Sequence, residues 1–108
     1  MKIRVYIASA YTIGDVAKNV KRQIDCADWL MNFGFAPFVP LLTHFQHLVH
    51  PRPYQDWLDL DFEWIKSCDC LLRLAGESKG ADLEVEFALK NNIPVFYSVE
   101  DILIHYST

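Results

Sequence analysis

Short apolar runs alternate along the chain with longer stretches in which apolar positions recur at helical spacing. The first run, residues 3–8, is apolar on both faces, which is typical of a buried parallel strand. Between the runs, apolar and polar positions separate onto two faces when placed about 100° apart, as in helices that cover a sheet. The pattern predicts strands at 3–8, 35–39, 69–74 and 95–97, and helices between Asp15 and Gly34 and over 54–68, 81–90 and 99–105.

This order of elements predicts a small α/β protein. Alternating strands and helices build βαβ units with right-handed crossovers, so we expect a parallel sheet. We expect a doubly wound, flavodoxin-like or Rossmann-like sheet of about four strands, with helices on both faces, in one domain over residues 1–108. Ligands of such folds bind beyond the carboxyl ends of the strands. The loops expected at that edge are 8–14, 40–53, 75–80 and 98–100.

Two carboxylates break the separation of polar and apolar faces. Helical spacing puts Glu84 on the inward side of the helix over 81–90. It also puts Asp61 in the middle of the apolar face of the helix over 54–68. A carboxylate among core positions costs free energy unless a partner or a ligand satisfies it. Each one alone could cap a loop or pair with an arginine, but two of them near strand ends favour a functional site.

The loop over residues 76–80 has the sequence Gly-Glu-Ser-Lys-Gly and opens the helix that carries Glu84. Backbone N–H groups and the helix dipole favour an anion at such a place, and Ser78 could add a hydroxyl. The loop has neither the GxxxxGK[ST] pattern of a P-loop nor the GxGxxG dinucleotide pattern. It is compatible with a phosphate subsite that includes Gly80 and also with an ordinary helix start.

Three histidines, His44, His47 and His50, lie in the expected loop over 40–53. Their spacing does not put three ring nitrogens on one helical face, and no cysteine or carboxylate ligand stands at suitable spacing, so we expect no metal. His44 follows the second strand closely and is expected to line the pocket. Tyr11, which follows the first strand, is also placed to reach a ligand.

Composition and charge narrow the class of protein. A hydrophobic fraction of 52% is enough for one core, whereas a net charge of −4 offers no broad basic surface for a nucleic-acid polymer. The three cysteines have an odd count and no CxxC pair, which is typical of a reducing cytosol. No signal peptide and no apolar run of membrane-spanning length is visible. We therefore expect a cytoplasmic protein that binds a small molecule and no membrane.

A pair of inward carboxylates beside an anion-binding loop suits glycosyl chemistry. The transition state of that chemistry resembles an oxocarbenium ion, so one carboxylate can attack or stabilise the electron-poor carbon while the other assists the leaving group. A glutamate in a partly apolar pocket is poorly solvated, which makes it a better nucleophile or charge stabiliser. The residue pattern alone does not fix this use.

Three stretches, in chain order, resemble the nucleoside 2-deoxyribosyltransferase superfamily, including its nucleoside 5′-monophosphate N-glycosidase branch. Residues 6–11, YIASAY, resemble the opening strand and nucleoside-binding loop of that superfamily, and this loop contains Ser9 and Tyr11. Residues 61–69, DFEWIKSCD, are similar to its D-x3-I-x3-D segment. Residues 78–88, SKGADLEVEFA, resemble the segment around its catalytic glutamate.

The resemblance implies roles for individual residues. Glu84 would be the nucleophile that attacks C1′ of the sugar, and Asp61 would contact the base and assist its departure. Tyr6 would help to position the sugar and the nucleophile. Ser78, with Gly80 two positions later, occupies the place where the monophosphate glycosidases hold the 5′-phosphate, which favours a nucleotide over a nucleoside. The resemblance also implies a homodimer or larger homo-oligomer that needs no cofactor.

The leading interpretation is an enzyme that cleaves or exchanges the N-glycosidic bond of a (deoxy)nucleoside 5′-monophosphate or a nucleoside. Hydrolysis and transfer both stay open, because water or a second base could resolve a glycosyl-enzyme. One alternative is a nucleotide-binding or sensor module on the same fold, which would bind without turnover. Another is an oligomeric interaction domain that uses Trp29 and Phe33 as contacts and binds no nucleotide.

Overall fold

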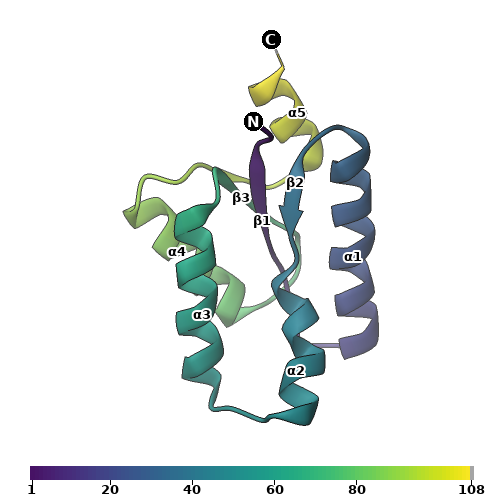
Figure 1. The fold of residues 1–108 in the computed structure, drawn as a ribbon, viewed down its shortest axis with the longest axis vertical. Helices are drawn as coiled ribbons and strands as arrows, with labels where there is room; N and C mark the ends of the chain where they lie inside the picture. Colours follow the sequence, from purple (N-terminus) through teal and green to yellow (C-terminus); the bar gives the residue numbers. More distant parts are fainter. Residues whose placement is uncertain (108) are drawn as a thin grey trace.

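The fold is seen in a computed structural model that describes residues 1–107. Strands and helices alternate along this part of the chain (Figure 1), as the hydrophobic pattern predicts. The strands are β1 (Arg4–Ala8), β2 (Ala36–Phe38), β3 (Cys70–Arg73) and β4 (Val95–Phe96). The helices are α1 (Val16–Asn32), the short 3₁₀ helix η1 (Pro40–Leu42), α2 (Thr43–Val49), α3 (Tyr54–Ser67), α4 (Lys79–Lys90) and α5 (Val99–Tyr106).

The four strands form one parallel sheet with the order β2-β1-β3-β4. In the register of this sheet, Tyr6 on β1 lies beside Phe38 on β2 and Leu71 on β3. The chain leaves β1 towards one edge of the sheet and returns to the other side of β1 through β3. This reversal between β1 and β3 is the switch point at which doubly wound sheets bind their ligands.

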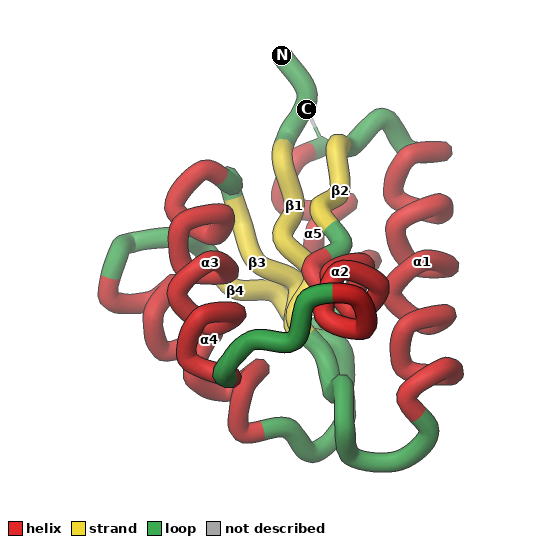
Figure 2. The backbone as a smooth tube through the Cα atoms, turned by 60° about the horizontal axis from the view of Figure 1, so that its bottom comes forward, coloured by secondary structure: helices red, strands yellow, loops and turns green. Residues whose placement is uncertain are grey.

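Helices cover both faces of the sheet, so the predicted fold class is confirmed. Figure 2 shows the strands between α3 and α4 on one side and α1 and α5 on the other. The first core includes Val5 and Ile7 of β1 packed with Leu30 of α1. The second core packs Tyr6 and Ala8 of β1 with α3 and α4. Because successive residues of a strand point to opposite faces, β1 feeds both cores.

Local signals set the helix ends. The carboxylate of Asp15 accepts a hydrogen bond of 3.0 Å from the Lys18 N–H and caps α1. Gly34 follows the end of this helix with a φ of +88°, a conformation that glycine adopts at little cost, as the predicted C-terminal glycine should. Ser98 caps α5 with a bond of 3.1 Å from the Asp101 N–H.

The expectation of a loop over 40–53 is wrong for most of that segment, which forms η1 and α2. Pro40 begins η1, where its missing N–H has no cost, and the hydroxyl of Thr43 donates to the Pro40 carbonyl at 2.8 Å. The hydrophobic pattern did not predict α2 because the apolar residues of this helix face solvent rather than a core. These exposed residues are Phe45, Leu48 and Val49.

Helical spacing in α1 predicts an inward face that includes Val16, Val20, Ile24, Ala27 and Met31, and this expectation is partly wrong. Ile24 and Met31 keep 42% and 61% of their surface exposed, whereas Gln23 is completely buried. Val20 and Ala27 are buried as expected, but Gln23 and Leu30 take the inward places of Ile24 and Met31, and the amide of Gln23 finds partners at the end of β1. Its Nε2 donates to the Ile7 carbonyl at 3.0 Å and to the Ser9 hydroxyl at 2.8 Å.

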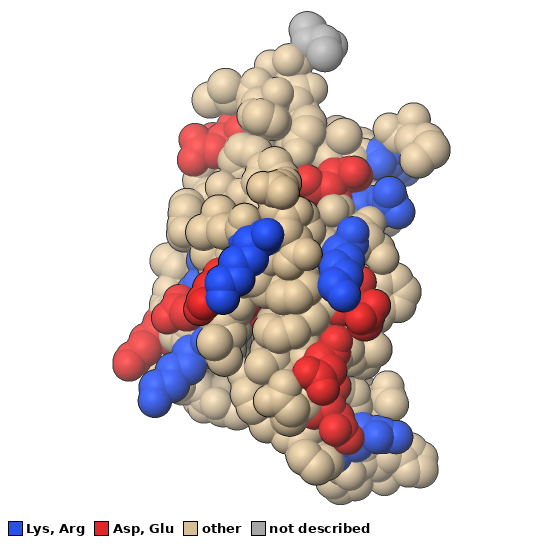
Figure 3. Space-filling model, turned by 90° about the vertical axis from the view of Figure 1, so that its left-hand side faces the viewer, with Lys and Arg blue, Asp and Glu red and all other residues tan. Residues whose placement is uncertain are grey.

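The surface over α3 and α4 carries both signs of charge. In Figure 3, Lys and Arg side chains lie beside Asp and Glu side chains, and neither sign forms a continuous patch. Two of the pairs on these helices are Lys66 with Glu63 and Lys90 with Glu86. Among residues 1–107, no helix is long and apolar enough to cross a membrane.

Candidate active site at the strand switch point

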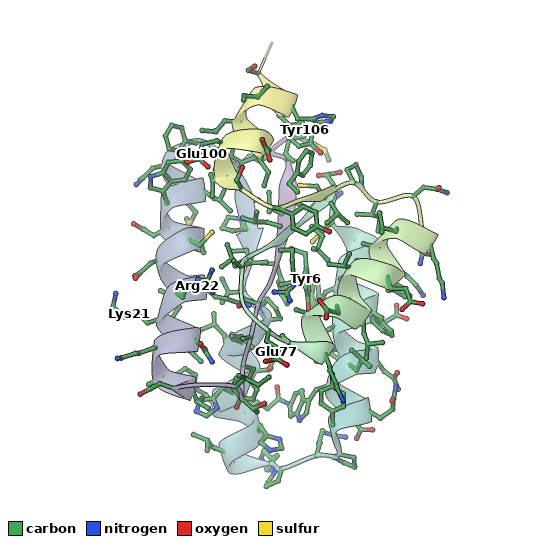
Figure 4. The ribbon with its side chains drawn as sticks, turned by 180° about the vertical axis from the view of Figure 1, so that it is seen from behind. Tyr6, Lys21, Arg22, Glu77, Glu100 and Tyr106 are labelled. Carbon is green, nitrogen blue, oxygen red and sulfur yellow. The ribbon has the colours of Figure 1, made fainter. Side chains whose placement is uncertain are left out.

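The two anomalous carboxylates meet on one face of the sheet, at the switch point between β1 and β3. Glu84 extends from the second turn of α4, and Asp61 from the middle of α3. Tyr6 rises from β1 towards both helices, and Figure 4 shows it in the middle of the molecule, between the sheet and these helices. Residues from three elements that are distant in sequence therefore form one polar cluster.

Glu84 is the centre of this cluster. Only 6% of its surface is exposed, and the hydroxyl of the fully buried Tyr6 donates a hydrogen bond to its Oε2. Burial, together with the charges of Glu84 and Asp61, raises the pKa of Tyr6 well above its usual value, so the hydroxyl stays protonated as a donor. The contact engages one carboxylate oxygen of Glu84 and orients the side chain.

Asp61 and Glu84 titrate as a pair. Burial raises the pKa of Asp61 to about 6, although hydrogen bonds with Glu84 and Tyr6 lower it. Burial, followed by the charge of Asp61, raises the pKa of Glu84 well above its usual value. Two neighbouring carboxyls with little water cannot both ionise readily, so each raises the cost of ionising the other. One carboxyl that is ionised beside one that is protonated is the state that paired acid and nucleophile chemistry requires.

Arg73 is a member of the cluster that the sequence interpretation missed. Its side chain is only 9% exposed, and it lies at the carboxyl end of β3. Its Nη1 donates to the Leu74 carbonyl at 2.5 Å, and its Nη2 donates to the Gly76 carbonyl at 2.8 Å and to Asp82 at 3.1 Å. Its positive charge lowers the pKa of Glu84. The signal was available, because an arginine inside the apolar strand is the same anomaly as Glu84 inside an apolar helix face.

The predicted phosphate loop leads directly into α4. The Ser78 hydroxyl accepts a hydrogen bond of 3.0 Å from the Ala81 N–H and thereby caps the helix. Gly80 lies in the first turn, where a Cβ atom would come within 2.7 Å of the Tyr54 hydroxyl. Tyr54 is a second residue that the sequence interpretation missed, since its place at the start of α3 gave no sign of a contact with α4.

Two other predicted pocket residues meet each other. The hydroxyl of Tyr11, in the loop after β1, forms a hydrogen bond with Nδ1 of His44 on α2. Their rings lie edge to face, with centroids 5.5 Å apart. Next to this pair, Ser9 is buried and its hydroxyl is engaged by Gln23. The loop after β1 is thus held by side chains from both α1 and α2.

Two of the hollows on the surface lie near the carboxyl ends of β2 and β3, and neither is lined by Glu84 or Asp61. One of about 280 Å³ lies beside Arg73 and Asp82 and reaches Tyr97. The other, of about 390 Å³, lies between the end of β2 and α2 and includes Phe38. The Phe38 ring stacks between Tyr6 and Trp64, with centroids 5.8 and 4.8 Å away. Within residues 1–107, no group of three metal-ligating side chains is gathered at either hollow or elsewhere.

The comparisons with known proteins agree with this fold. The chain belongs to a family described as a domain of unknown function (DUF7768), whose profile matches residues 3–98. Its structure is similar to that of a 2-deoxyribosyltransferase from the psychrotolerant bacterium Bacillus psychrosaccharolyticus, which is described as a biocatalyst for nucleoside synthesis. That likeness has a TM-score of 0.62 at 19% identity and covers 85% of this chain and 69% of the other. At this identity the likeness shows a shared fold, and no curated protein matches the chain.

Proposed function

We propose that the protein cleaves or transfers the N-glycosidic bond of a (deoxy)nucleoside 5′-monophosphate or nucleoside, with Glu84 as the nucleophile. The observation that carries the proposal is the buried Glu84, oriented by the Tyr6 hydroxyl and placed against Asp61 at the strand switch point. The shared fold with a 2-deoxyribosyltransferase supports the same choice of chemistry.

The first step needs Glu84 ionised and Asp61 protonated. Contact between the two carboxyls lets their shared proton pass from Glu84 to Asp61. The carboxylate of Glu84 then attacks C1′ of the sugar, and the bond from C1′ to the base nitrogen breaks with its electron pair on the base. Asp61 gives its proton to the departing base. Tyr6 is fully buried and acts on Glu84, so it is a positioning residue.

The second step releases the sugar from Glu84. In hydrolysis, a water molecule attacks C1′ while Asp61, now ionised, takes one of its protons, and the ester bond to Glu84 breaks. In transfer, a nitrogen of a second base attacks C1′ instead and loses its proton to Asp61. Both outcomes regenerate the two carboxyls with one proton between them. A second base as co-reactant is therefore the variable that distinguishes a transferase from a hydrolase.

The 5′-phosphate of a nucleotide would lie at the start of α4. Ser78 and Gly80 are located there, and the N-terminus of a helix favours a negative charge. Tyr11 and His44 would contact the nucleoside from the neighbouring loops, with Ser9 supporting them from beneath. Ser78 stands where the resemblance to the monophosphate glycosidases implies a phosphate contact, and this feature favours a monophosphate substrate.

We further propose that the protein works in the cytoplasm as a homodimer or larger homo-oligomer. Its three cysteines are free, and burial raises the pKa of the Cys68 thiol to about 11 and that of Cys70 to about 12. Such thiols are unreactive packing groups that suit a reducing compartment. Two exposed aromatic side chains at the end of α1, Trp29 and Phe33, have ring centroids 4.4 Å apart and offer a contact for a second copy. Light scattering of the purified protein measures its mass.

Product analysis tests the proposed chemistry. Purified protein is incubated with deoxynucleoside and ribonucleoside 5′-monophosphates and with the matching nucleosides, with and without a second free base, and products are separated by chromatography. We expect free base or an exchanged nucleoside from the wild type and none from Glu84→Gln. Glu86→Gln is the matched control, because Glu86 lies on the same helix, is exposed and pairs with Lys90 at 2.9 Å.

The near-complete burial of Glu84 favours one other candidate, a nucleotide-binding module without turnover. Titration calorimetry with the same compounds separates the two candidates. An enzyme is expected to bind nucleotide in the Glu84→Gln variant and to turn it over only in the wild type. Binding by both proteins with no product from either, with or without a second base, would favour the module.

A further inference from the structure

The hydroxyl of Tyr54 lies so close to Gly80 that a side chain at residue 80 would crowd it. The tyrosine begins α3, and its hydroxyl reaches the first turn of α4, where it lies 2.7 Å from the place of a Cβ atom on Gly80. A glycine inside a helix costs about 1 kcal/mol relative to alanine. An alanine here would force the Tyr54 hydroxyl to move from this place, so Gly80 leaves room for the tyrosine in its present position.

Packing alone gives no reason for this arrangement. Tyr54 keeps 60% of its surface exposed and belongs to neither core, so its ring adds little to the burial of apolar surface. The ring nevertheless stands close to the carboxyl pair. Burial of the hydroxyl, followed by the negative charges of Glu84 and Asp61, raises the pKa of Tyr54. An exposed aromatic ring thus lies near the buried Glu84 and the half-buried Asp61.

We propose that the ring of Tyr54 contacts the substrate at the entrance of the Glu84 site, and that Gly80 leaves room for the tyrosine at this place. The inference rests on the proposed function and extends it, since it names a specificity-determining residue of the same site. The part of the substrate that the Tyr54 ring would contact is the flat ring of the nucleobase or the face of the sugar. Stacking of a base on an aromatic side chain contributes enough for its loss to weaken binding about 10-fold to 100-fold.

Four variants test the inference: Tyr54→Phe, Tyr54→Ala, Gly80→Ala and the double variant Tyr54→Ala with Gly80→Ala. KM and kcat are measured for the nucleotide or nucleoside that the wild type uses best. Affinity for the same compound is measured by calorimetry in the Glu84→Gln background, where no turnover interferes. Leu89→Ala, which removes an exposed apolar side chain near the far end of α4, is the matched control.

We expect Tyr54→Ala to raise KM and the dissociation constant about 10-fold to 100-fold and to change kcat by less than about 3-fold. Tyr54→Phe keeps the ring, so both constants are expected to stay within about 3-fold of the wild type. Gly80→Ala is expected to raise KM in the same direction because it pushes the ring away. The double variant is expected to match Tyr54→Ala, since the group that Gly80 accommodates is then missing.

The outcomes separate the two proposals. A wild-type KM and affinity in Tyr54→Ala, beside an active wild type, overturn this inference alone. So does a double variant in which the two losses add, because Gly80 would then act independently of Tyr54. A wild type that neither turns over nor binds any compound of the panel overturns the proposed function and this inference with it. A wild type that binds without turnover leaves the affinity series to decide by the same criteria.

Discussion

The hydroxyl of Tyr6 on β1 donates a hydrogen bond to Oε2 of Glu84 on α4, across 78 positions of sequence. Both residues are buried, so the contact is part of the second core as well as of the candidate site. It satisfies a carboxylate oxygen that would otherwise be costly to bury, and it fixes the direction of the other oxygen.

Loss of this hydroxyl is therefore expected to affect stability and catalysis together. Tyr6→Phe keeps the ring that stacks on Phe38, but it leaves an oxygen of Glu84 without its donor. We expect unfolding in urea to show a loss of about 1–3 kcal/mol. Misplacement of Glu84, the proposed nucleophile, is expected to lower kcat about 10-fold to 100-fold.

The pH profile gives the same variant a second readout. The hydrogen bond from Tyr6 lowers the pKa of Glu84, so its removal is expected to move the acidic limb of kcat/KM to higher pH. Tyr106→Phe is the control, because Tyr106 lies on α5 against the opposite face of the sheet. A Tyr6→Phe profile that overlays the wild type would contradict the positioning role.

The carboxyl pair should make stability depend on pH in an unusual direction. The pKa of Asp61 is raised from 3.8 to about 6 because burial disfavours its charged form. The folded protein then binds this proton more tightly than the unfolded chain does, so the stabilisation is complete below about pH 4 and is lost as pH rises through about 6. The shift corresponds to at most about 3 kcal/mol.

Urea unfolding between pH 4 and pH 7 measures this dependence. We expect the free energy of unfolding to fall with rising pH in the wild type and to fall less steeply in Asp61→Asn. The exposed Asp59 on the same helix, which accepts a hydrogen bond from Gln55 at 2.8 Å, provides the control Asp59→Asn. Equal slopes in the wild type and Asp61→Asn would show that Asp61 is well solvated after all.

Arg73 offers a third prediction, because its charge favours the ionised form of Glu84. Arg73→Met is expected to raise the pKa of Glu84 and to move the acidic limb of kcat/KM to higher pH. Arg73→Lys keeps the charge but loses the planar fork that reaches two carbonyls of the loop over 74–76, so a smaller shift is expected.

A control variant separates the charge of Arg73 from its hold on the loop. Asp82→Asn removes the exposed partner of the arginine and leaves the guanidinium in place. We expect its pH profile to match the wild type. A shift in Asp82→Asn as large as that in Arg73→Met would show that the loop position, and not the charge, controls Glu84.

The fold was predictable because its signals are local. Buried parallel strands are apolar on both faces, and the start of α1 after Asp15 is visible in the sequence. Helix α2 was missed because its apolar residues face solvent, which removes the inward stripe on which the prediction depends.

The candidate site was predictable only in part. The inward positions of Glu84 and Asp61 follow from helical spacing, but their contact depends on the strand order, which no local pattern encodes. Tyr54 was invisible for a related reason, since its contact with Gly80 joins two helices that only the folded sheet brings together. Arg73 could have been found, because a charge inside an apolar strand is a local anomaly.

Gln23 leads to the last prediction, which concerns the scaffold of the site. This amide is completely buried and makes three hydrogen bonds: it donates to Ile7 and Ser9 and accepts from the Leu41 N–H at 3.3 Å. The side chain of Gln23 thus connects α1 to the end of β1, where the loop that carries Tyr11 begins, and to η1.

Gln23→Leu fits the apolar face but leaves these buried groups without partners. We expect a loss of about 2–4 kcal/mol in the free energy of unfolding, since each unpaired buried group costs about 1–3 kcal/mol and the losses overlap. Amide hydrogen exchange is expected to speed up in the loop after β1. The neighbouring Ile24→Leu changes an exposed side chain and should leave both measurements unchanged. A Gln23→Leu protein as stable as the wild type would mean that water replaces the amide, and that the loop does not depend on it.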